Sequence, residues 1–354
     1  MPRRILLLIT DLQIGGTPTV VRELAFRLAQ EEGVQVHVAC LDRWGPVADQ
    51  LKARGIAVTA LAASSRLDAG VVFKLIRLIH REQIDAVFSF LIHANTTAAL
   101  AGLASRHVRF FQSIQTTQPK PRWHWMLQHI VQHAADAIVV PSPSVAAAAR
   151  KWAGIAAEKI VVIPNAVEIG EFSIPKRNIP GTRIGFIGRL DPIKRIDDLI
   201  AAVALLPEEF TLDIYGEGSQ RLPIESMIRR LSLGPRVTLH GAVAGAAEAL
   251  AGIDLLVLPS DAEGFGLVLI EAMAASVPVI GTHVPGICDV IRHGANGILV
   301  RPRNPKALAE AIGRVLSDGS LRENLIAGGI ASVRDRYSWS MVYPQYRALL
   351  VNHT

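Results

Sequence analysis

IDLLVLPSDAEGFGLVLIEAMAASVPVI, residues 253–280, reads as a strand, a loop, a helix and a second strand in direct succession. The apolar run at 254–258 is typical of a strand buried on both faces of a parallel sheet. A proline and several glycines predict the loop, and good helix formers from Leu267 to Ala275 predict the helix. The stretch therefore predicts an α/β fold with a loop at the carboxyl end of a strand, where open parallel sheets bind ligands.

The loop of this stretch has the composition of an anion site. The helix N-terminus near Gly266 and Leu267 offers N–H groups and a partial positive charge, which suit a phosphate. Glu263 lies in the loop and Glu271 lies about one turn into the helix, so we expect two different roles for them. The alternative is a surface loop in which Glu263 only favours the helix N-terminus.

Length and composition restrict the class of protein. The 354 residues suffice for two domains, and half of them are hydrophobic. The two cysteines form no disulfide framework or zinc motif, and no apolar run is long enough for a signal peptide or a membrane-spanning helix. We therefore expect a cytoplasmic protein. Its net charge of +6 suits nucleotides, nucleic acid or lipid headgroups, without choosing among them.

The first half of the chain predicts repeated strand–helix units. Gly15–Gly16 precedes a helix expected at 19–30, either as a plain turn or as a pair of backbone donors to a phosphate. After the fourth strand, Asn95 is expected to cap a helix, and His93 is either a loop histidine or a residue that faces a ligand. Ser144 is expected to cap a later helix. Strands are predicted at residues 4–10, 34–40, 56–61, 86–90, 136–140 and 159–164.

Residues 117–133 combine cations, tryptophans and an apolar helical pattern. Lys120 and Arg122 lie beside Trp123 and Trp125, and apolar residues continue along the predicted helix. This combination fits a helix at an anionic membrane surface, and equally a helix that buries its indoles in its own domain. Nucleic-acid binding is the weaker interpretation, because no known module or extended basic stripe accompanies the segment.

The second half opens with a strand predicted at 184–187 and two cations, Arg189 and Lys194, in the loop that follows. Cations beside a helix start suit a diphosphate, because arginine offers a planar fork and lysine a point charge. The alternative is two solvated cations that pair with Asp191 and Asp197. Two prolines and a glycine at 166–180 predict a linker between the two halves.

Several of these segments resemble the retaining glycosyltransferases of family 4, which have the GT-B fold. PSDAEGFGLVLIEAMA is similar to their Glu-x7-Glu signature, here Glu263 and Glu271. TRIGFIGRLDPIKR is similar to their Gly-Arg-Leu segment with its following lysine, although Arg195 stands at a usual glycine. IPNAVEIGEF is similar to their linker. Asp289 replaces a usual glutamate.

The resemblance implies two Rossmann-like domains that face a cleft. An acceptor-binding domain is expected at 1–165, a linker at 166–180, a nucleotide-sugar-binding domain at 181–335, and at 336–354 a terminal helix that crosses back to the first domain. The implied reaction transfers a sugar, with retention of configuration, from a UDP- or GDP-linked donor to an acceptor hydroxyl. The implied acceptors are those of polysaccharide, lipopolysaccharide or glycolipid synthesis, some of them linked to lipid, and a peripheral contact with an anionic membrane is compatible with them.

The resemblance also assigns roles to residues. Arg189, Lys194 and the amides of Gly15 and Gly16 would stabilise the departing diphosphate. Glu271 would hold the ribose, whereas Glu263 and His93 would hold hydroxyl groups of the sugar. The expected donor-binding set further includes Gly264, Phe265, Gly266 and Leu267. No Asp-x-Asp clamp is present, so neither a metal nor another cofactor is expected.

Other functions stay open on the sequence. A catalytically silent partner of another transferase would bind nucleotide sugars without turning them over, although the intact Glu263, Arg189 and Lys194 argue against it. An epimerase on the same fold would isomerise the nucleotide sugar. A nucleic-acid-binding protein would show salt-dependent binding to a duplex or a single strand and none to nucleotide sugars.

Overall fold

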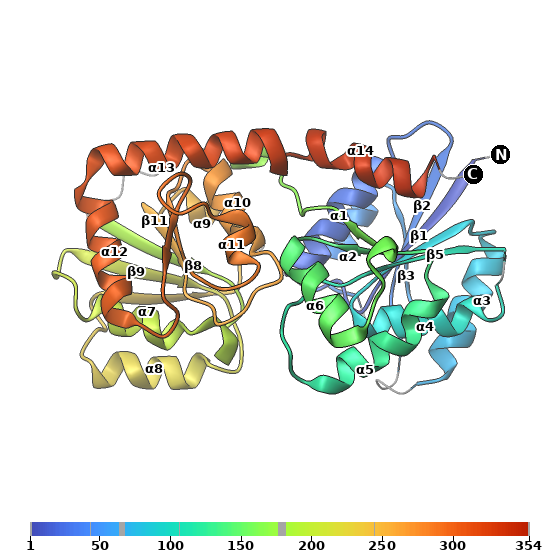
Figure 1. The fold of residues 1–354 in the computed structure, drawn as a ribbon, viewed down its shortest axis with the longest axis horizontal. Helices are drawn as coiled ribbons and strands as arrows, with labels where there is room; N and C mark the ends of the chain where they lie inside the picture. The colour runs from blue at the N-terminus through green and yellow to red at the C-terminus, as the bar shows by residue number, and fades with distance from the viewer. Residues whose placement is uncertain are drawn as a thin grey trace. The chain divides into compact units, whose positions relative to one another are not determined.

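The computed structural model describes residues 2–42, 44–63, 68–105, 107–175, 182–243 and 245–352. The chain forms two compact units, one from residues 1–164 with 342–354 and the other from residues 165–341. Each unit is a parallel sheet covered by helices, so the prediction of two Rossmann-like α/β domains is confirmed (Figure 1). Of the linker expected at 166–180, residues 176–180 lie outside the described residues.

The first unit is built on a seven-stranded sheet. Its strands follow the spatial order β3-β2-β1-β4-β5-β6-β7, and every pairing is parallel. Strand β1 has neighbours on both edges and helices on both faces, which is why its apolar residues 5–9 are fully buried. The strands are β1 Arg3–Ile9, β2 Val34–Cys40, β3 Ala57–Ala60, β4 Ala86–Phe90, β5 Arg109–Ser113, β6 Ala137–Val140 and β7 Ile160–Val162.

Helices cover both faces of this sheet. Figure 1 shows α3, α4 and α5 on one side of the strands and α1 and α2 on the other. Helix α1 begins at Gly16, earlier than expected, so the glycine pair lies at the helix N-terminus itself. The prediction that Ser144 caps α6 is wrong. Pro143 occupies the first helical position, and the Ser142 hydroxyl accepts from the Val145 N–H at 3.2 Å. The helices are α1 Gly16–Leu28, α2 Pro46–Ala53, α3 Gly70–Arg81, α4 Ile92–Gly102, α5 Arg122–Val131 and α6 Pro143–Ala153.

The last helix, α14 at Trp339–Leu350, packs against the first unit. The Tyr346 ring lies 6.1 Å from the Phe88 ring, and Arg347 pairs with Glu31 at 3.0 Å. The chain therefore returns at its end to the unit in which it begins, as the resemblance implies.

The second unit is built on a six-stranded parallel sheet in the order β10-β9-β8-β11-β12-β13. Strand β11 lies next to the central strand β8, and its residues Leu255–Leu258 are buried, as their unbroken apolar run predicts. The strands are β8 Thr182–Ile187, β9 Phe210–Tyr215, β10 Val237–Gly241, β11 Leu255–Leu258, β12 Val279–Thr282 and β13 Ile298–Val300.

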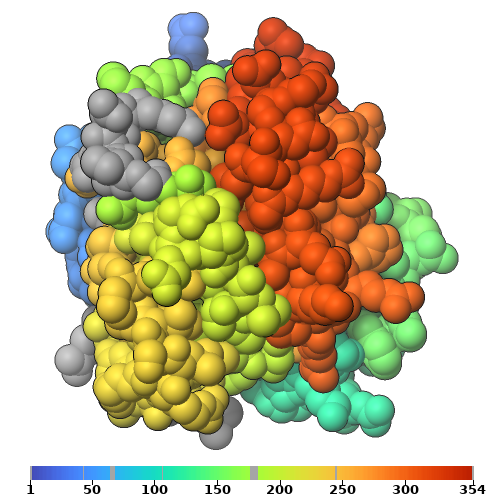
Figure 2. Space-filling model, turned by 90° about the vertical axis from the view of Figure 1, so that its left-hand side faces the viewer, coloured from blue at the N-terminus to red at the C-terminus, as the bar shows by residue number. Residues whose placement is uncertain are grey.

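The helices of the second unit form two layers. Figure 1 shows α7 and α8 on one side of the strands and α9, α10 and α13 on the other. In Figure 2, α8 (yellow) and the pair α12 and α13 (orange-red) form much of one face of the unit. The helices are α7 Ile196–Val203, α8 Arg221–Arg230, α9 Ala246–Leu250, α10 Leu267–Ala274, α11 Ile287–Val290, α12 Pro305–Ser317 and α13 Gly319–Ser332. Among the described residues, no helix combines the length and apolar character needed to span a membrane.

Candidate functional site

Each unit brings its candidate residues to the point where its strand order reverses. In the second unit the chain runs from β8 outward to β9 and β10, then returns to β11 on the opposite edge of β8. The loop after β8 carries Arg189 and Lys194, and the loop after β11 carries Glu263. Ligands of open α/β sheets bind at such a switch point, because the two loops diverge there. The fold therefore brings together two segments that the sequence separates widely.

The two loops of the second unit are joined by specific bonds. The Asp261 N–H donates to the Ile193 carbonyl at 2.8 Å. The Lys194 ammonium lies 2.5 Å from Glu263 Oε1, and the Ser260 hydroxyl donates to the same oxygen at 2.7 Å. The Lys194 and Glu263 side chains are only 18% and 12% exposed, so water screens their attraction weakly. The carboxylate of Glu263 is thus fixed in place before any ligand arrives.

Glycines allow the backbone to pack closely around this carboxylate. Gly266 has φ 81°, in the left-handed region that favours glycine, and it directly precedes α10. Gly286 has φ 86°, and a Cβ on it would lie 2.2 Å from the Glu263 carbonyl oxygen. Both positions require glycine, and together they present the first turn of α10 with its N–H groups beside Glu263.

Arg189 is far more exposed than Lys194. Its side chain is 73% exposed and pairs with Asp191 at 3.2 Å. An exposed pair of this kind contributes little stability, so Arg189 can leave Asp191 for a ligand at low cost. The loop beneath it is rigid, because the Leu190 N–H donates to the Glu217 carbonyl at 2.8 Å. The alternative that both cations pair with neighbouring aspartates therefore holds for Arg189 and fails for Lys194.

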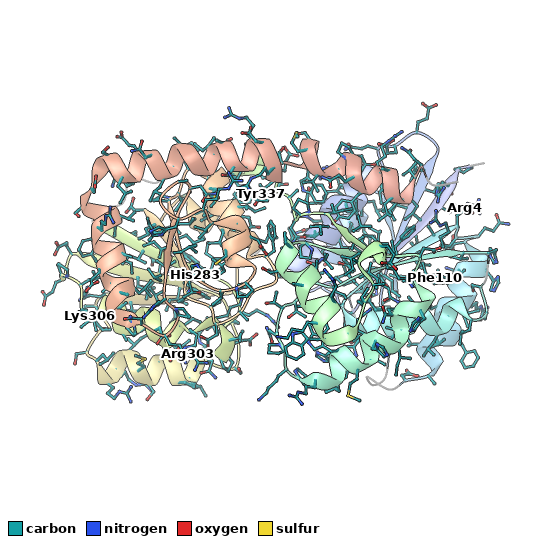
Figure 3. All side chains as sticks on the ribbon, viewed as in Figure 1. Arg4, Phe110, His283, Arg303, Lys306 and Tyr337 are labelled. Atoms are coloured by element: carbon teal, nitrogen blue, oxygen red, sulfur yellow. The ribbon has the colours of Figure 1, made fainter. Side chains whose placement is uncertain are left out.

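A network of charged side chains borders the same loops. Arg195 has φ 52° and ψ 43°, the left-handed conformation that suits the glycine of the family pattern. Its guanidinium binds both carboxylate oxygens of Asp198 at 2.9 Å and one of Asp197 at 2.9 Å, and these contacts, led by Asp198, raise its pKa. Arg303, labelled in Figure 3, holds the carboxylate of Asp261 at 2.8–3.1 Å. The charge of Asp261 is thereby offset beside a site that is expected to bind an anion.

The remaining donor-site candidates lie on α10 and its preceding loop. Glu271 is half-buried and lies one turn beyond the helix start, as predicted. Phe265 is buried, and its ring meets the Tyr337 ring edge-on, with centroids 5.5 Å apart. Phe265 therefore supports the loop from within the core. Gly264 and Leu267 flank it in the same segment.

The first unit has its own switch point, between β1 and β4. Gly15 and Gly16 follow β1, and His93 follows β4 as the second residue of α4. Leu91 precedes α4 with φ 73°, a strained conformation for a leucine, and such strain is concentrated at functional sites. The His93 ring lies 5.9 Å from the Trp123 ring and 6.3 Å from the His124 ring. The structure thus places the unusual segment at α5 directly beside His93.

A buried polar network that the sequence did not predict holds α4 and α5 on the sheet. Asn95 accepts from the Ser89 hydroxyl at 2.8 Å and donates to the Ser113 carbonyl and to the Gln128 side chain, both at 3.1 Å. The Gln128 amide in turn donates to the Gln112 side chain at 2.7 Å. Four of these residues had no assigned role, because the network depends on β5, which was not predicted from its short RFFQS segment. The signal that could have predicted this strand is the pair of phenylalanines at 110–111, which is followed by the polar residues Gln112 and Ser113.

One prediction in this region is wrong. Asn95 does not cap a helix, because α4 begins earlier, at Ile92, and encloses Asn95 in its buried face. The two indoles also differ. Trp125 is 4% exposed and donates to the Gln118 carbonyl at 2.8 Å, whereas Trp123 is 45% exposed. Of these two indoles, Trp123 lies at the surface and Trp125 lies in the core.

Comparison with known proteins identifies the family. The model described as "Glycosyl transferases group 1" matches residues 171–331, and the model described as "Glycosyltransferase Family 4" matches residues 14–171. The chain belongs to glycosyltransferase family 4.

Curated relatives carry glycosyltransferase names. A D-inositol 3-phosphate glycosyltransferase of Xylanimonas cellulosilytica is 30% identical over 62% of this chain and 58% of its own length. A phosphatidyl-myo-inositol mannosyltransferase of Mycobacterium leprae is 35% identical over 56% of this chain and 55% of its own length. An uncharacterized glycosyltransferase of Methanocaldococcus jannaschii is 34% identical over 52% of each chain. The chain thus spans about half the length of these relatives.

Solved structures share the whole fold. Anabaena HepE, solved in complex with UDP-glucose, has a TM-score of 0.88 and 22% identity, and the match covers 99% of this chain and 100% of HepE. A sucrose-phosphate synthase from Thermosynechococcus elongatus has a TM-score of 0.84 and 22% identity over the same shares. These likenesses confirm the GT-B fold.

Proposed function

We propose that this family 4 glycosyltransferase transfers a sugar, with retention of configuration, from a UDP- or GDP-linked donor to an acceptor hydroxyl. The observation that carries the proposal is the Lys194–Glu263 pair at the switch point of the second unit, next to the N-terminus of α10. A cation and helix amides suit a diphosphate, and a fixed carboxylate suits a sugar hydroxyl. The HepE structures with UDP and UDP-glucose support the same donor class.

The chemical difficulty is the leaving group, since a diphosphate gains negative charge as the glycosidic bond breaks. Lys194 has three N–H donors, so its contact with Glu263 leaves donors for a phosphate oxygen. Arg189 is exposed and can turn from Asp191 toward the same group. The free amides at the start of α10 add further donors. Preorganised donors of this type lower the barrier because they do not have to reorient as the charge develops.

The two glutamates have separate tasks in this proposal. Glu271, on the helix beside the phosphate-binding turn, holds the ribose hydroxyls. Glu263, oriented by Lys194 and Ser260, accepts from a hydroxyl of the transferred sugar. The acceptor hydroxyl attacks the face that the diphosphate leaves, and its proton passes to the departing phosphate oxygen. The bond from carbon to the diphosphate oxygen breaks as the bond to the acceptor oxygen forms.

In this proposal, the backbone amides of Gly15 and Gly16 donate to the diphosphate of the donor, and His93 contacts a hydroxyl group of the sugar, as the family resemblance implies. Activity is proposed to need no metal ion. Among the described residues, no group of three His, Cys, Asp or Glu side chains is placed to hold one, and side-chain cations and helix amides can supply the positive charge. The acceptor is proposed to be a carbohydrate, free or lipid-linked, and the segment from Lys120 to Val131 is the candidate contact with a membrane.

A panel of nucleotide sugars tests this function. UDP-glucose, UDP-galactose, UDP-N-acetylglucosamine and GDP-mannose are each incubated with the protein, and released nucleotide is measured with and without excess EDTA. We expect release from one of them above the level of a Glu263→Ala control, unchanged by EDTA. Water is then the acceptor, and NMR recorded before the released sugar mutarotates should show an unchanged anomeric configuration. The absence of both thermal stabilisation and release with every donor would contradict the proposal, and activity restored only by Mg²⁺ or Mn²⁺ would contradict its metal-free part.

A further inference from the structure

The helix layer α3–α5 of the first unit exposes many large apolar side chains. Helix α3 contacts α4, and α4 contacts α5. On this layer, Met126 is 68% exposed, Ile130 66% and Leu103 74%. Phe73, Leu100 and Trp123 are exposed as well. Scattered apolar residues are common on protein surfaces, but several on adjacent helices of one layer indicate a surface that binds something.

Helix α5 shows that these residues are not needed for the fold. Its inward face consists of Trp125, Gln128 and Val131, which are buried. Trp123, Met126 and Ile130 follow one another at intervals of three and four residues, so they form a second stripe along the helix. This stripe is exposed, and the contacts of the unit therefore leave it available for a partner.

The charge of α4 and α5 is one-sided. From Ala86 to Ala135 the chain contains no aspartate or glutamate, and this range includes all of α4 and α5. Lys120 and Arg122 are exposed at the end of α5 that carries Trp123. A surface that combines cations and apolar side chains with no acid is complementary to a partner that has a negatively charged surface and an apolar interior.

Helix α8 of the second unit provides the contrast. It also exposes a large apolar side chain, Leu222. Its cation Arg221, however, forms ion pairs with Glu217 and with Glu225. Exposed leucine with mixed charges is an ordinary solvated surface. The acid-free composition, and not apolar exposure alone, therefore distinguishes the α4–α5 face.

We propose that the face formed by α4 and α5 binds the surface of an anionic lipid bilayer. Lys120 and Arg122 contact lipid phosphates, the Trp123 indole lies at the headgroup level, and Met126 and Ile130 enter the acyl boundary. The inference rests on the peripheral contact in the proposed function and locates it on named residues. Because His93 contacts Trp123, membrane binding would bring a lipid-carried acceptor to the switch point of the first unit.

Vesicle sedimentation of the whole chain tests the proposal. Wild type is compared with Met126→Ser/Ile130→Ser on vesicles of phosphatidylcholine with phosphatidylglycerol and on phosphatidylcholine alone. Both residues are exposed and outside the catalytic machinery, and Trp123 is left intact because it contacts His93. The matched control is Leu205→Ser/Leu222→Ser, which removes two exposed leucines of the second unit.

We expect wild type and the control to bind anionic vesicles alike and the α5 variant to bind at least about tenfold more weakly, which corresponds to the apolar surface of two side chains. Binding should weaken as salt rises and be absent on neutral vesicles. Failure of wild type to bind at low salt, or equal binding by the α5 variant, would overturn the proposal. A dimer that dissociates in the α5 variant, without vesicle binding, would instead assign the face to a second copy of the chain. Nucleotide binding by each variant reports on the transferase site separately.

Discussion

The two switch points of the molecule are built from different chemistry. In the second unit, Lys194 and Glu263 meet in a partly buried ion pair, with helix amides beside them. In the first unit, His93 faces aromatic and imidazole rings above a buried amide network. Charged groups suit a ligand that is itself charged, and neutral hydrogen-bonding and ring surfaces suit sugars and their hydroxyls. Under the proposed function, the charged side chains that bind the diphosphate come from the second unit, whereas His93 of the first unit contacts a neutral hydroxyl group.

The two glutamates of the second unit give the largest expected effect, and they test how that unit divides the donor between them. Glu271→Ala should weaken nucleoside diphosphate binding by about tenfold, the effect of losing a hydrogen bond to a charged group. Glu263→Ala should leave that binding unchanged or make it tighter, because Lys194 loses its competing carboxylate, while the rate of transfer falls by about 10²–10³. Titration calorimetry and initial rates measure the two effects. The reverse ranking of affinities would exchange the assigned roles.

The glycine behind Glu263 gives a test of intermediate size. Gly286→Ala places a Cβ 2.2 Å from the Glu263 carbonyl oxygen, so the loop must move. Gly294→Ala is the matched control, since Gly294 also has positive φ, +76°, but has nothing within 4 Å of the new Cβ. We expect a loss of unfolding free energy of about 2–4 kcal/mol for Gly286→Ala and about 1 kcal/mol for Gly294→Ala, from urea titration. Equal losses would show that the loop is not held by this contact.

Arg195 gives the smallest expected effect. Arg195→Gly removes the strain of a left-handed arginine and also its pairs with Asp197 and Asp198. The relief of backbone strain raises the free energy of unfolding and the loss of the ion pairs lowers it, by about 1 kcal/mol each. The net change in the free energy of unfolding should therefore be less than about 1 kcal/mol. Donor turnover should also be maintained. If turnover falls strongly while the free energy of unfolding is unchanged, Arg195 has a role in the reaction beyond its ion pairs with Asp197 and Asp198.

Local sequence patterns predicted the second unit better than the first. The strand, loop and helix of 253–280 follow from apolar runs and glycines that are contiguous in the chain, and α10 begins at Leu267 as predicted. The pairing of Lys194 with Glu263 could not be predicted from local sequence patterns, because it depends on β8 and β11 being neighbours in the sheet. The left-handed conformations of Leu91 and Arg195 also have no signal in residue type.

In the first unit, the error at Asn95 has a cause in the tertiary structure. Asn95 was interpreted by its local preference for helix caps, whereas its environment is set by β5 and α5, which are distant in sequence. For the two indoles, the helical period itself was informative. Trp123 and Trp125 are two residues apart and thus roughly 200° apart around a helix, so only one of them could face the core. The fold then decided which one.

Binding of a nucleoside diphosphate tests the central claim most directly. UDP, GDP and the corresponding nucleosides are titrated calorimetrically into wild type, Arg189→Ala/Lys194→Ala and His93→Ala. We predict that wild type binds a diphosphate more tightly than its nucleoside and that the double variant binds the diphosphate at least about tenfold more weakly. His93→Ala should bind it within about twofold of wild type. An equal loss in His93→Ala, or undiminished binding by the double variant, would contradict the assignment of the diphosphate to the switch point of the second unit.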